Sequence, residues 1–279
     1  MSATSAKAPA ITAKVQAQVG NQGSMRNTNQ RREQLLKLLM EQGSVQVSDL
    51  VPLLGVSAVT IRHDLDHFEQ QGLLTRNYGG AFFNPRGTPE QDIREKDHLN
   101  PTLKERIGAR AAEMVLPGEN ILIDSGTTTH KLARYLRTAQ DLTVMSNGLN
   151  IVEELAQAEG VQVMITGGVL RKASQSFQGV QAEASLAAYN FDKLFLGVDG
   201  FDLHFGITTH SEREASLNRK MVERSRRTIV MTDSSKFGRV SLHRIIGLER
   251  VQAVITDAGI SAEYRDGLQR LGIELILVD

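Results

Sequence analysis

The feature that most constrains the fold is an alternation of short apolar runs with helical patterns between residues 120 and 278. The runs have the length and the branched or large apolar residues of β-strands, and helical patterns such as those over 129–136, 150–158 and 212–226 fill most of the gaps. Such alternation places helices on both faces of a parallel sheet, so it predicts an α/β, Rossmann-like domain. The predicted strands are 120–123, 142–145, 161–165, 193–198, 228–231, 253–256 and 274–278.

A different pattern precedes this domain. Three short helical segments begin near residue 31, each is followed by a glycine, and the second and third have a serine placed to act as an N-cap. Two short helices joined around a glycine form a helix-turn-helix, and the β-prone residues 73–83, broken by a Gly-Gly pair, indicate a hairpin or wing. We therefore predict an α+β winged helix-turn-helix domain over residues 26–83. The glycines and serines are Gly43, Gly55, Gly72, Ser48 and Ser57.

The remaining segments are predicted to be a tail and a linker. Residues 1–25 are rich in Ala, Thr, Ser and Gln, with Lys7 and Lys14 as their charges, which favours disorder. Lys14 also interrupts the one apolar stretch there that a signal peptide would need. Residues 84–100 combine proline and glycine with mixed charges, which is typical of a linker, so the α/β domain is expected to span residues 101–279.

Composition excludes several classes of site. The 279 residues include no cysteine, which rules out disulfides, thiolate metal sites and a cysteine nucleophile; a reducing cytoplasm fits this, and we expect a cytoplasmic protein. No apolar run approaches the roughly 18 residues of a membrane span, so we expect no membrane partner. Lys+Arg and Asp+Glu number 32 each, but residues 1–86 carry a net charge of +3 and the rest −3, an asymmetry that permits DNA binding by the front domain.

The third helical segment offers side chains to DNA. Its buried face is set by Ile61, Leu65 and Phe68, so other residues of its first turns face solvent. A recognition helix reads base edges with its N-terminal residues, and hydroxyl groups there can contact phosphate. The same residue types also occur in ordinary solvated helices, and helix-turn-helix units also mediate protein contacts. The candidate DNA-binding residues are Ser57, Val59, Thr60, Arg62 and His63 on the helix, with Arg76 and Tyr78 on the wing.

Loops rich in glycine, hydroxyl and amide groups follow five predicted strands of the α/β domain. Open parallel sheets bind ligands at the carboxyl ends of their strands, and a helix N-terminus after a glycine loop supplies free N–H groups to an anion. Each loop alone is ordinary turn chemistry, but five at one edge favour a pocket that holds a phosphate through residues 126–129 and Lys236, and sugar hydroxyls through Asn147 and Asp199. The candidate ligand-binding residues are Asp124, Ser125, Gly126, Thr127, Thr128, Thr129, Asn147, Gly148, Gly167, Gly168, Asp199 and Lys236.

Long motifs in both domains resemble those of DeoR-family bacterial transcription regulators. Residues 43–50, 56–65, 72–76 and 78–81 are similar to the family's winged helix-turn-helix, in which T-I-R-x-D-L belongs to the recognition helix and R-x-x-G-G-A to the wing. His63 departs from the family, since many members have a second arginine there. The motifs D-S-G-T-T, S-N-G, T-G-G, G-V-D-G, E-A and D-S-S-K-F, at 124–128, 146–148, 166–168, 197–200, 214–215 and 233–237, resemble its sensor domain, with Ser146 where threonine is frequent.

This resemblance implies a repressor of a sugar or amino-sugar catabolic operon that a phosphorylated sugar relieves. The sensor domain of the family is related to ribose-5-phosphate isomerase, and the resemblance adds Glu214 to the candidate ligand-binding residues. It implies double-stranded operator DNA, a phosphorylated sugar or amino sugar, and further copies of the chain in a dimer or tetramer as partners. Residues 123–129, 175–177 and 209–210 are most similar to regulators of N-acetylgalactosamine and galactosamine catabolism.

A sugar-phosphate isomerase with an added DNA-binding module is the alternative. Isomerisation needs a carboxylate base that moves a proton between adjacent carbons. The related isomerases carry a D-G-A-D-E-type cluster where this chain has Asp199-Gly200-Phe201-Asp202, so one aspartate matches and Phe201 breaks the acidic pair. We expect binding without turnover, no catalytic residue and no cofactor. His63 and His67 have an i, i+4 spacing but no obvious third ligand, so no metal site is predicted.

Overall fold

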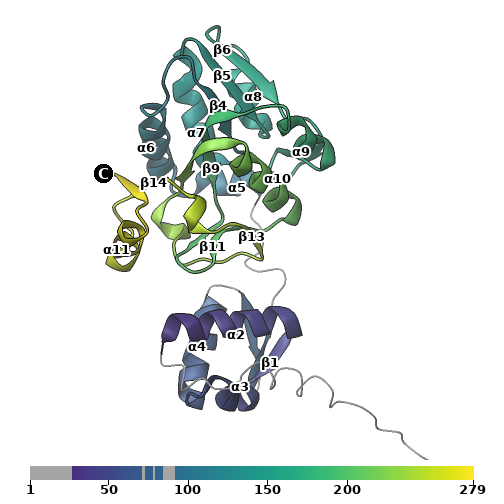
Figure 1. Cartoon of the computed structure of the whole chain (residues 1–279), viewed down its shortest axis with the longest axis vertical. Coiled ribbons are helices and arrows are strands. Elements are labelled where there is room, and N and C mark those ends of the chain that lie inside the picture. Colours follow the sequence, from purple (N-terminus) through teal and green to yellow (C-terminus); the bar gives the residue numbers. More distant parts are fainter. Residues whose placement is uncertain (1–26, 71–72, 78, 84–91) are drawn as a thin grey trace, which may run out of the picture. The chain divides into compact units, whose positions relative to one another are not determined.

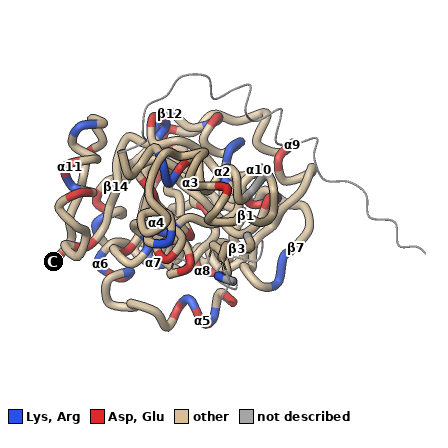
Figure 2. Tube along the Cα trace, turned by 90° about the horizontal axis from the view of Figure 1, so that it is seen from below, with Lys and Arg blue, Asp and Glu red and all other residues tan. Residues whose placement is uncertain are grey.

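The computed structural model describes residues 27–70, 73–77, 79–83 and 92–279. The predicted tail over residues 1–25 and Tyr78 lie outside the described residues. The chain divides into two compact units, one within residues 27–83 and the other within residues 92–279, and each is described by itself (Figure 1). Charges of both signs are spread over both units (Figure 2).

The first unit is a winged helix-turn-helix. Its helices enclose a core that includes Leu35, Leu39, Ile61 and Leu65, each at most 1% exposed. Among the described residues, its three strands pair antiparallel in the order β1-β3-β2, and the predicted hairpin is formed by β2 and β3. Strand β1 was not predicted. The elements are α2 (Thr28–Gln42), β1 (Ser44–Gln46), α3 (Val47–Leu54), α4 (Ala58–Gln70), β2 (Leu74–Asn77) and β3 (Gly80–Phe83).

The predicted helix ends are largely confirmed. Gly43 and Gly55 end α2 and α3 in the left-handed conformation, with φ of 73° and 64°. Ser57 caps α4, because its Oγ accepts a hydrogen bond from the N–H of Thr60 at 3.2 Å. Ser48 is not the N-cap of α3; Gln46 is, and the Ser48 hydroxyl bonds the carboxylate of Asp49 instead.

The second unit contains a parallel sheet with the strand order β15-β14-β12-β9-β4-β5-β6. The chain runs outward from β4 in one direction and from β9 in the other, so β4 and β9 are the strands at which the order reverses. Ligands of open α/β sheets bind at this reversal. The strands are β4 (Asn120–Ile123), β5 (Leu142–Ser146), β6 (Val161–Ile165), β9 (Phe191–Gly197), β12 (Ser225–Met231), β14 (Ala253–Asp257) and β15 (Glu274–Val278).

Helices cover both faces of this sheet, as predicted (Figure 1). Successive strand residues enter different cores: Ile121 and Ile123 of β4 pack with α6, α7 and α8, whereas Leu122 packs with α9, α10 and α11. This alternation explains why the strands read as continuous apolar runs rather than as alternating patterns. The helices are α6 (Pro101–Ala112), α7 (Thr127–Tyr135), α8 (Leu149–Leu155), α9 (Val180–Leu186), α10 (Glu212–Glu223) and α11 (Ala262–Arg270).

Several elements of the second unit differ from the predictions. The helix predicted over 212–226 ends at Glu223, because the chain turns there and enters β12 at Ser225. Two smaller sheets were not predicted: a hairpin of β7 (Val169–Arg171) with β8 (Ser176–Gln178), and a sheet of β10 (Gly200–Asp202), β11 (Gly206–Thr209) and β13 (His243–Ile246). Their strands are too short for a strong periodicity.

The predicted linker over residues 84–100 needs a correction. Residues 84–91 lie outside the described residues, but α5 (Ile93–His98) is a helix of the second unit. Its first residue, Ile93, is 7% exposed, and two of the charged residues that suggested a linker, Lys96 and Asp97, form ion pairs with Asp199 and Lys131. In the part of the chain that the structure describes, no helix is long and apolar enough to cross a membrane.

Candidate functional site

Helix α4 presents the predicted DNA-binding residues on one side. Ile61, Leu65 and Phe68 are buried as predicted, while the side chain of Val59 is 72% exposed and Arg62 and His63 are exposed. Ser57 is exposed at the helix start, where its hydroxyl lies 2.9 Å from that of Thr60. An exposed valine beside an arginine, a histidine and two hydroxyl groups suits a surface that meets base edges and phosphates.

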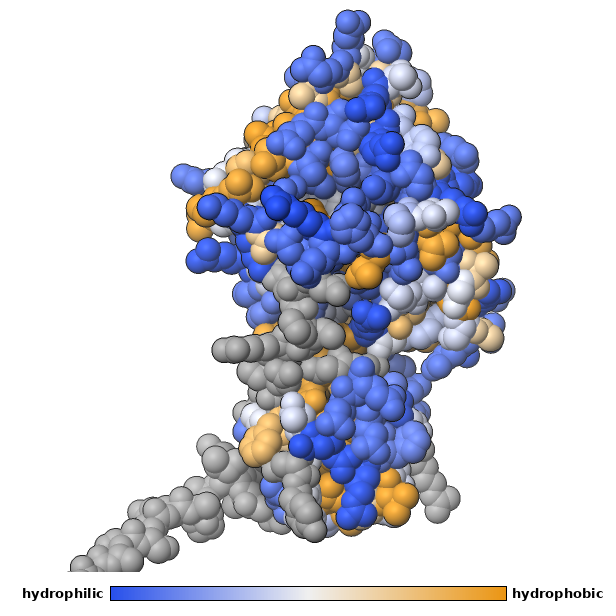
Figure 3. Space-filling view, turned by 180° about the vertical axis from the view of Figure 1, so that it is seen from behind, coloured by the Kyte–Doolittle hydropathy of each residue, from blue (hydrophilic) through white to orange (hydrophobic). Residues whose placement is uncertain are grey.

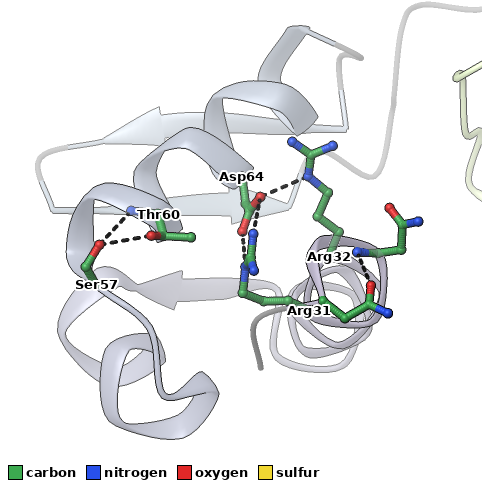
Figure 4. A network of polar contacts seen from close by, with 7 residues as sticks. Arg31, Arg32, Ser57, Thr60 and Asp64 are labelled. Atoms are coloured by element: carbon green, nitrogen blue, oxygen red, sulfur yellow. Dashed lines mark hydrogen bonds and ion pairs between the residues drawn. The ribbon is translucent and has the colours of Figure 1, made fainter. Parts of the chain in front are cut away.

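Asp64, on the opposite side of α4, is part of a buried charge cluster that sequence reasoning missed (Figure 4). Its Oδ2 accepts from Nε of Arg31 at 2.6 Å, and its Oδ1 accepts from Nε of Arg32 at 2.9 Å. The side chains of Asp64 and Arg31 are 2% and 6% exposed. The cluster therefore fixes the recognition helix against α2. A polar residue between Ile61 and Leu65 on the apolar stripe was the signal that could have revealed it.

Arg76 of the wing contacts the recognition helix in this structure. Its guanidinium pairs with the carboxylate of Asp66 and donates to the carbonyl oxygen of Arg62 at 3.3 Å. Its backbone N–H donates to Glu69 at 3.0 Å. These contacts hold β2 beside α4, and a contact between Arg76 and DNA stays a prediction.

A cavity of about 390 Å³ lies at the carboxyl ends of β4, β9 and β12, where the strand order reverses. Eight of the predicted ligand-binding residues line it. The loop after β4 supplies three of them, the first turn of α7 supplies two, and the loop after β9, α10 and the short helical turn after β12 supply one each. They are Asp124, Ser125, Gly126, Thr127, Thr128, Asp199, Glu214 and Lys236.

The other predicted ligand-binding residues lie behind this lining or beside it. The side chain of Asn147 accepts from the N–H of Ser125 at 2.8 Å and donates to Oδ1 of Asp124 at 3.1 Å. The Thr129 hydroxyl donates to the carbonyl oxygen of Gly126 at 3.2 Å. These side chains position the loop after β4, and the structure does not bring them to the cavity wall. Gly148, Gly167 and Gly168 also lie outside the lining, the last two in the turn that leads to β7.

Sequence reasoning did not identify many of the other residues that line the cavity. Lys104 lies on the apolar stripe of α6 with Ile107, Gly108 and Ala111, and it is 4% exposed. A lysine at that spacing is the signal that could have identified it. The residues on α5 and in the loop before β8 had no such signal. Gly197, Val198, Asp233 and Ser235 also line the cavity and lie in loops that the sequence analysis had singled out. The missed lining residues are Ile93, Lys96, Leu99, Asn100, Lys104, Ala173, Ser174, Thr232 and Arg239.

Asp199 is held as a charged carboxylate in this cavity. Burial by itself raises the pKa of Asp199, but the charges of Lys96, His210 and Lys236 outweigh that effect and place the pKa below its ordinary range. Nζ of Lys96 lies 2.7 Å from its Oδ1, and the Thr209 hydroxyl donates to its Oδ2 at 2.9 Å. Both oxygens of Asp199 therefore have donors.

The pKa of Asp124 is shifted in the opposite direction. Burial and the nearby charge of Glu214 raise the pKa of Asp124 well above its ordinary value. Its Oδ1 is held by Asn147, while its Oδ2 is buried without a hydrogen-bond partner among the residues that the structure describes. Such an oxygen costs free energy until a donor reaches it, so a ligand hydroxyl or ammonium group would be stabilised there.

Two lysines and a helix N-terminus make the cavity attractive to an anion. Burial lowers the pKa of Lys104 to about 8, partly offset by Asp233, and burial also lowers the pKa of Lys236. Helix α7 begins at Thr127, and its N-cap residue, Gly126, has no side chain to bond the first N–H groups of the helix. Among the described residues, no group of three or more potential metal ligands occurs.

Comparison with known proteins identifies both units. A family model described as "DeoR-like helix-turn-helix domain" matches residues 31–86, and one described as "DeoR C terminal sensor domain" matches residues 99–258. A solved structure of ribose 5-phosphate isomerase A from Methanocaldococcus jannaschii covers 50% of this chain and 55% of its own, with 16% identity and a TM-score of 0.38. At this level the likeness supports no statement about function.

Relatives match nearly the whole chain. A protein of Escherichia coli O157:H7 named "Putative aga operon transcriptional repressor" is 50% identical over 90% of this chain and 94% of its own length. "Transcriptional repressor AccR" of Agrobacterium fabrum is 35% identical over 84% of this chain and 91% of its own. The predicted family and fold class are confirmed. The chain belongs to the DeoR family of transcriptional regulators, with a DNA-binding helix-turn-helix domain ahead of an α/β sensor domain.

Proposed function

We propose that this regulator represses a sugar or amino-sugar catabolic operon in the cytoplasm and that a phosphorylated sugar, bound in the cavity at the strand ends, relieves the repression. The observation that carries the proposal is the cavity itself, in which buried ammonium groups and a helix N-terminus share one space with carboxylates. The names of the relatives from Escherichia coli and Agrobacterium fabrum support repression.

The cationic and the acidic groups of the cavity suit different parts of a sugar phosphate. Lys104, Lys236 and the N–H groups at the start of α7 suit the phosphate, because anions bind at cations and helix N-termini. Glu214 suits sugar hydroxyls or an ammonium group, since its carboxylate offers acceptor oxygens. Asp124 suits sugar hydroxyls, since its raised pKa favours a neutral carboxyl, which can both donate and accept.

We further propose that the cavity binds its ligand without converting it. Asp202, the second carboxylate after β9, accepts from the N–H groups of His204 and Phe205 at 2.8 and 2.9 Å and so is engaged in a turn. Phe201 is fully buried, and Asp199, with a lowered pKa and an ion pair to Lys96, is a poor proton acceptor.

Calorimetric titration of the full-length protein with hexose phosphates, amino-sugar phosphates and their unphosphorylated counterparts tests the sensor half. We expect one phosphorylated sugar to bind about tenfold or more tightly than its unphosphorylated form, because a charged hydrogen bond contributes roughly 1.5–3 kcal/mol. Nuclear magnetic resonance of the recovered ligand should show it unchanged. Rapid aldose–ketose interconversion would favour an isomerase instead.

Arg62→Ala tests the DNA-binding half. Arg62 is exposed on α4, so we expect roughly tenfold weaker operator binding and, if the guanidinium contacts a phosphate, a salt dependence reduced by about one counterion. Fluorescence anisotropy at several salt concentrations measures both. Arg270→Ala, at an exposed position on α11 of the sensor unit, is the matched control and should bind like wild type. Equal affinity and slope for Arg62→Ala and the control would remove Arg62 from the interface.

We also propose that the regulator acts as a homo-oligomer, a dimer or a tetramer, on repeated half-sites of double-stranded operator DNA. Apolar side chains that reach the surface of the sensor unit support this, among them Val169 and Val180, which are 63% and 83% exposed; Figure 3 shows apolar residues at the surface on one face of the molecule. Sedimentation equilibrium should give a multiple of the chain mass, and a monomer at all concentrations would exclude this part of the proposal.

A further inference from the structure

Helix α5 forms one wall of the cavity. It is the first element of the sensor unit, and residues 84–91 join it along the chain to β3 of the wing. Of all elements that line the cavity, α5 is thus the one nearest in sequence to the DNA-binding domain. The four residues that it and the turn after it contribute, here called the α5 wall, are Ile93, Lys96, Leu99 and Asn100.

Carboxylates of the cavity hold the α5 wall in place. Nζ of Lys96 lies 2.7 Å from Oδ1 of Asp199, and Nδ2 of Asn100 donates to Oδ1 of Asp233 at 3.1 Å. Asp199 and Asp233 both line the cavity. The position of α5 therefore depends on groups for which a bound ligand competes.

A bound phosphate could compete with Asp199 for the ammonium group of Lys96. The side chains are 22% and 10% exposed, so the interaction is only weakly screened by water. Asp199 keeps a second donor in the Thr209 hydroxyl, and Lys104, which bonds the carbonyl oxygen of Lys96, brings another ammonium group to the same wall. A phosphate dianion that enters beside Lys104 should attract the Lys96 ammonium at least as strongly as the carboxylate of Asp199 does, because it carries more negative charge.

We propose that Lys96 is an effector-binding residue and also the link between the cavity and the DNA-binding domain. Lys96, paired with Asp199, holds α5 in the position that permits operator binding. A sugar phosphate draws the Lys96 ammonium from Asp199 to its phosphate oxygens, so α5 is held differently once the phosphate binds. An effector needs this kind of unequal contact in two states to shift their populations. The inference rests on the sugar-phosphate cavity proposed above.

The first test uses no ligand. In full-length Lys96→Met, we expect hydrogen exchange over residues 96–100 to be faster and operator binding to be about tenfold or more weaker than in wild type, because the buried charge of Asp199 loses its partner. Asp199→Asn should give the same change, and the double variant little more, since both remove one interaction. Lys96→Arg, which keeps the charge, should restore operator binding, a rescue that a purely space-filling role would not give.

Lys220→Met is the matched control, because Lys220 is an exposed lysine of α10 that pairs with Glu223 outside the cavity. It should behave like wild type in both measurements. Wild-type operator affinity and exchange in Lys96→Met would overturn the proposal.

The second test adds inorganic phosphate or a hexosamine 6-phosphate to the wild-type protein. We expect the amino-sugar phosphate to slow hydrogen exchange over residues 124–129 and to speed it over residues 96–100. Slower exchange in the first region with no change or slowing in the second would contradict the role of Lys96. If neither region responds to any probe, the sugar-phosphate function fails, and the ligand-free test still decides whether the Lys96 pair controls DNA binding.

Discussion

Replacement of Asp64 by alanine should strongly destabilise the winged domain, because it weakens the packing of the recognition helix α4 against α2. Asp64 holds two arginines in a buried cluster, and its loss removes the buried carboxylate that both of them bond. Removing one partner of a buried ion pair typically costs about 3–5 kcal/mol. We expect hydrogen exchange of α2 and α4 in the full-length protein to show a loss of stability of about 3 kcal/mol or more, with loss of operator binding.

Asp49→Ala is the matched control for this experiment. Asp49 is an exposed aspartate of α3. Among the described residues, its side chain bonds only the hydroxyl of the neighbouring Ser48. Its replacement should therefore lower the free energy of unfolding by no more than about 1 kcal/mol. Unchanged protection of α2 and α4 in Asp64→Ala would show that the cluster does not stabilise the domain. A conserved exchange pattern with lost DNA binding would instead assign Asp64 a role in binding alone.

Affinity for the sugar phosphate should fall about tenfold between pH 7 and pH 9. Burial lowers the pKa of Lys104 to about 8, and only its protonated form attracts a phosphate. The protonated fraction is high at pH 7 and low at pH 9, so affinity is lost as the pH rises through 8. The ligand's own charge does not oppose this, because a phosphate monoester with a second pKa of about 6 is a dianion throughout.

Calorimetry at pH 7, 8 and 9 without DNA measures this directly. Lys104→Met should bind more weakly at pH 7 and lose most of the pH dependence, while a residual slope is expected from Lys236, whose pKa burial also lowers. Lys220→Met, outside the cavity, should keep the wild-type profile. Equal wild-type affinity at pH 7 and 9 would exclude Lys104 from the phosphate site.

The sequence predicts the sheet well because its strands are continuous apolar runs, and central strands such as β4, β5 and β14 are buried on both faces. Strands 120–123, 161–165 and 274–278 match β4, β6 and β15 residue for residue. Strand β1 was missed because its three residues pair with the wing and have no periodicity of their own. The sequence predicts a linker where α5 lies because the charges of this segment are typical of a solvated stretch, although Lys96 and Asp97 pair with residues far along the chain.

The cavity, too, could be predicted from the sequence only in part. Loops directly after strands could be predicted, since the carboxyl ends of parallel strands meet at one edge and bring Asp124, Asp199 and Lys236 together. The sequence could not separate residues that face the cavity from those that position them, such as Asn147, because both kinds are polar and adjacent in the chain. Nor could it place Lys96, whose partner, Asp199, is 103 residues away.

The most direct test of the central claim is fluorescence anisotropy of the full-length protein on DNA from upstream of its own gene, with and without a panel of hexose and amino-sugar phosphates. We predict specific binding that one phosphorylated sugar releases and its unphosphorylated form does not. Binding that no phosphorylated sugar changes would contradict the proposed effector class, and equal affinity for the upstream DNA and unrelated DNA would contradict operator recognition itself.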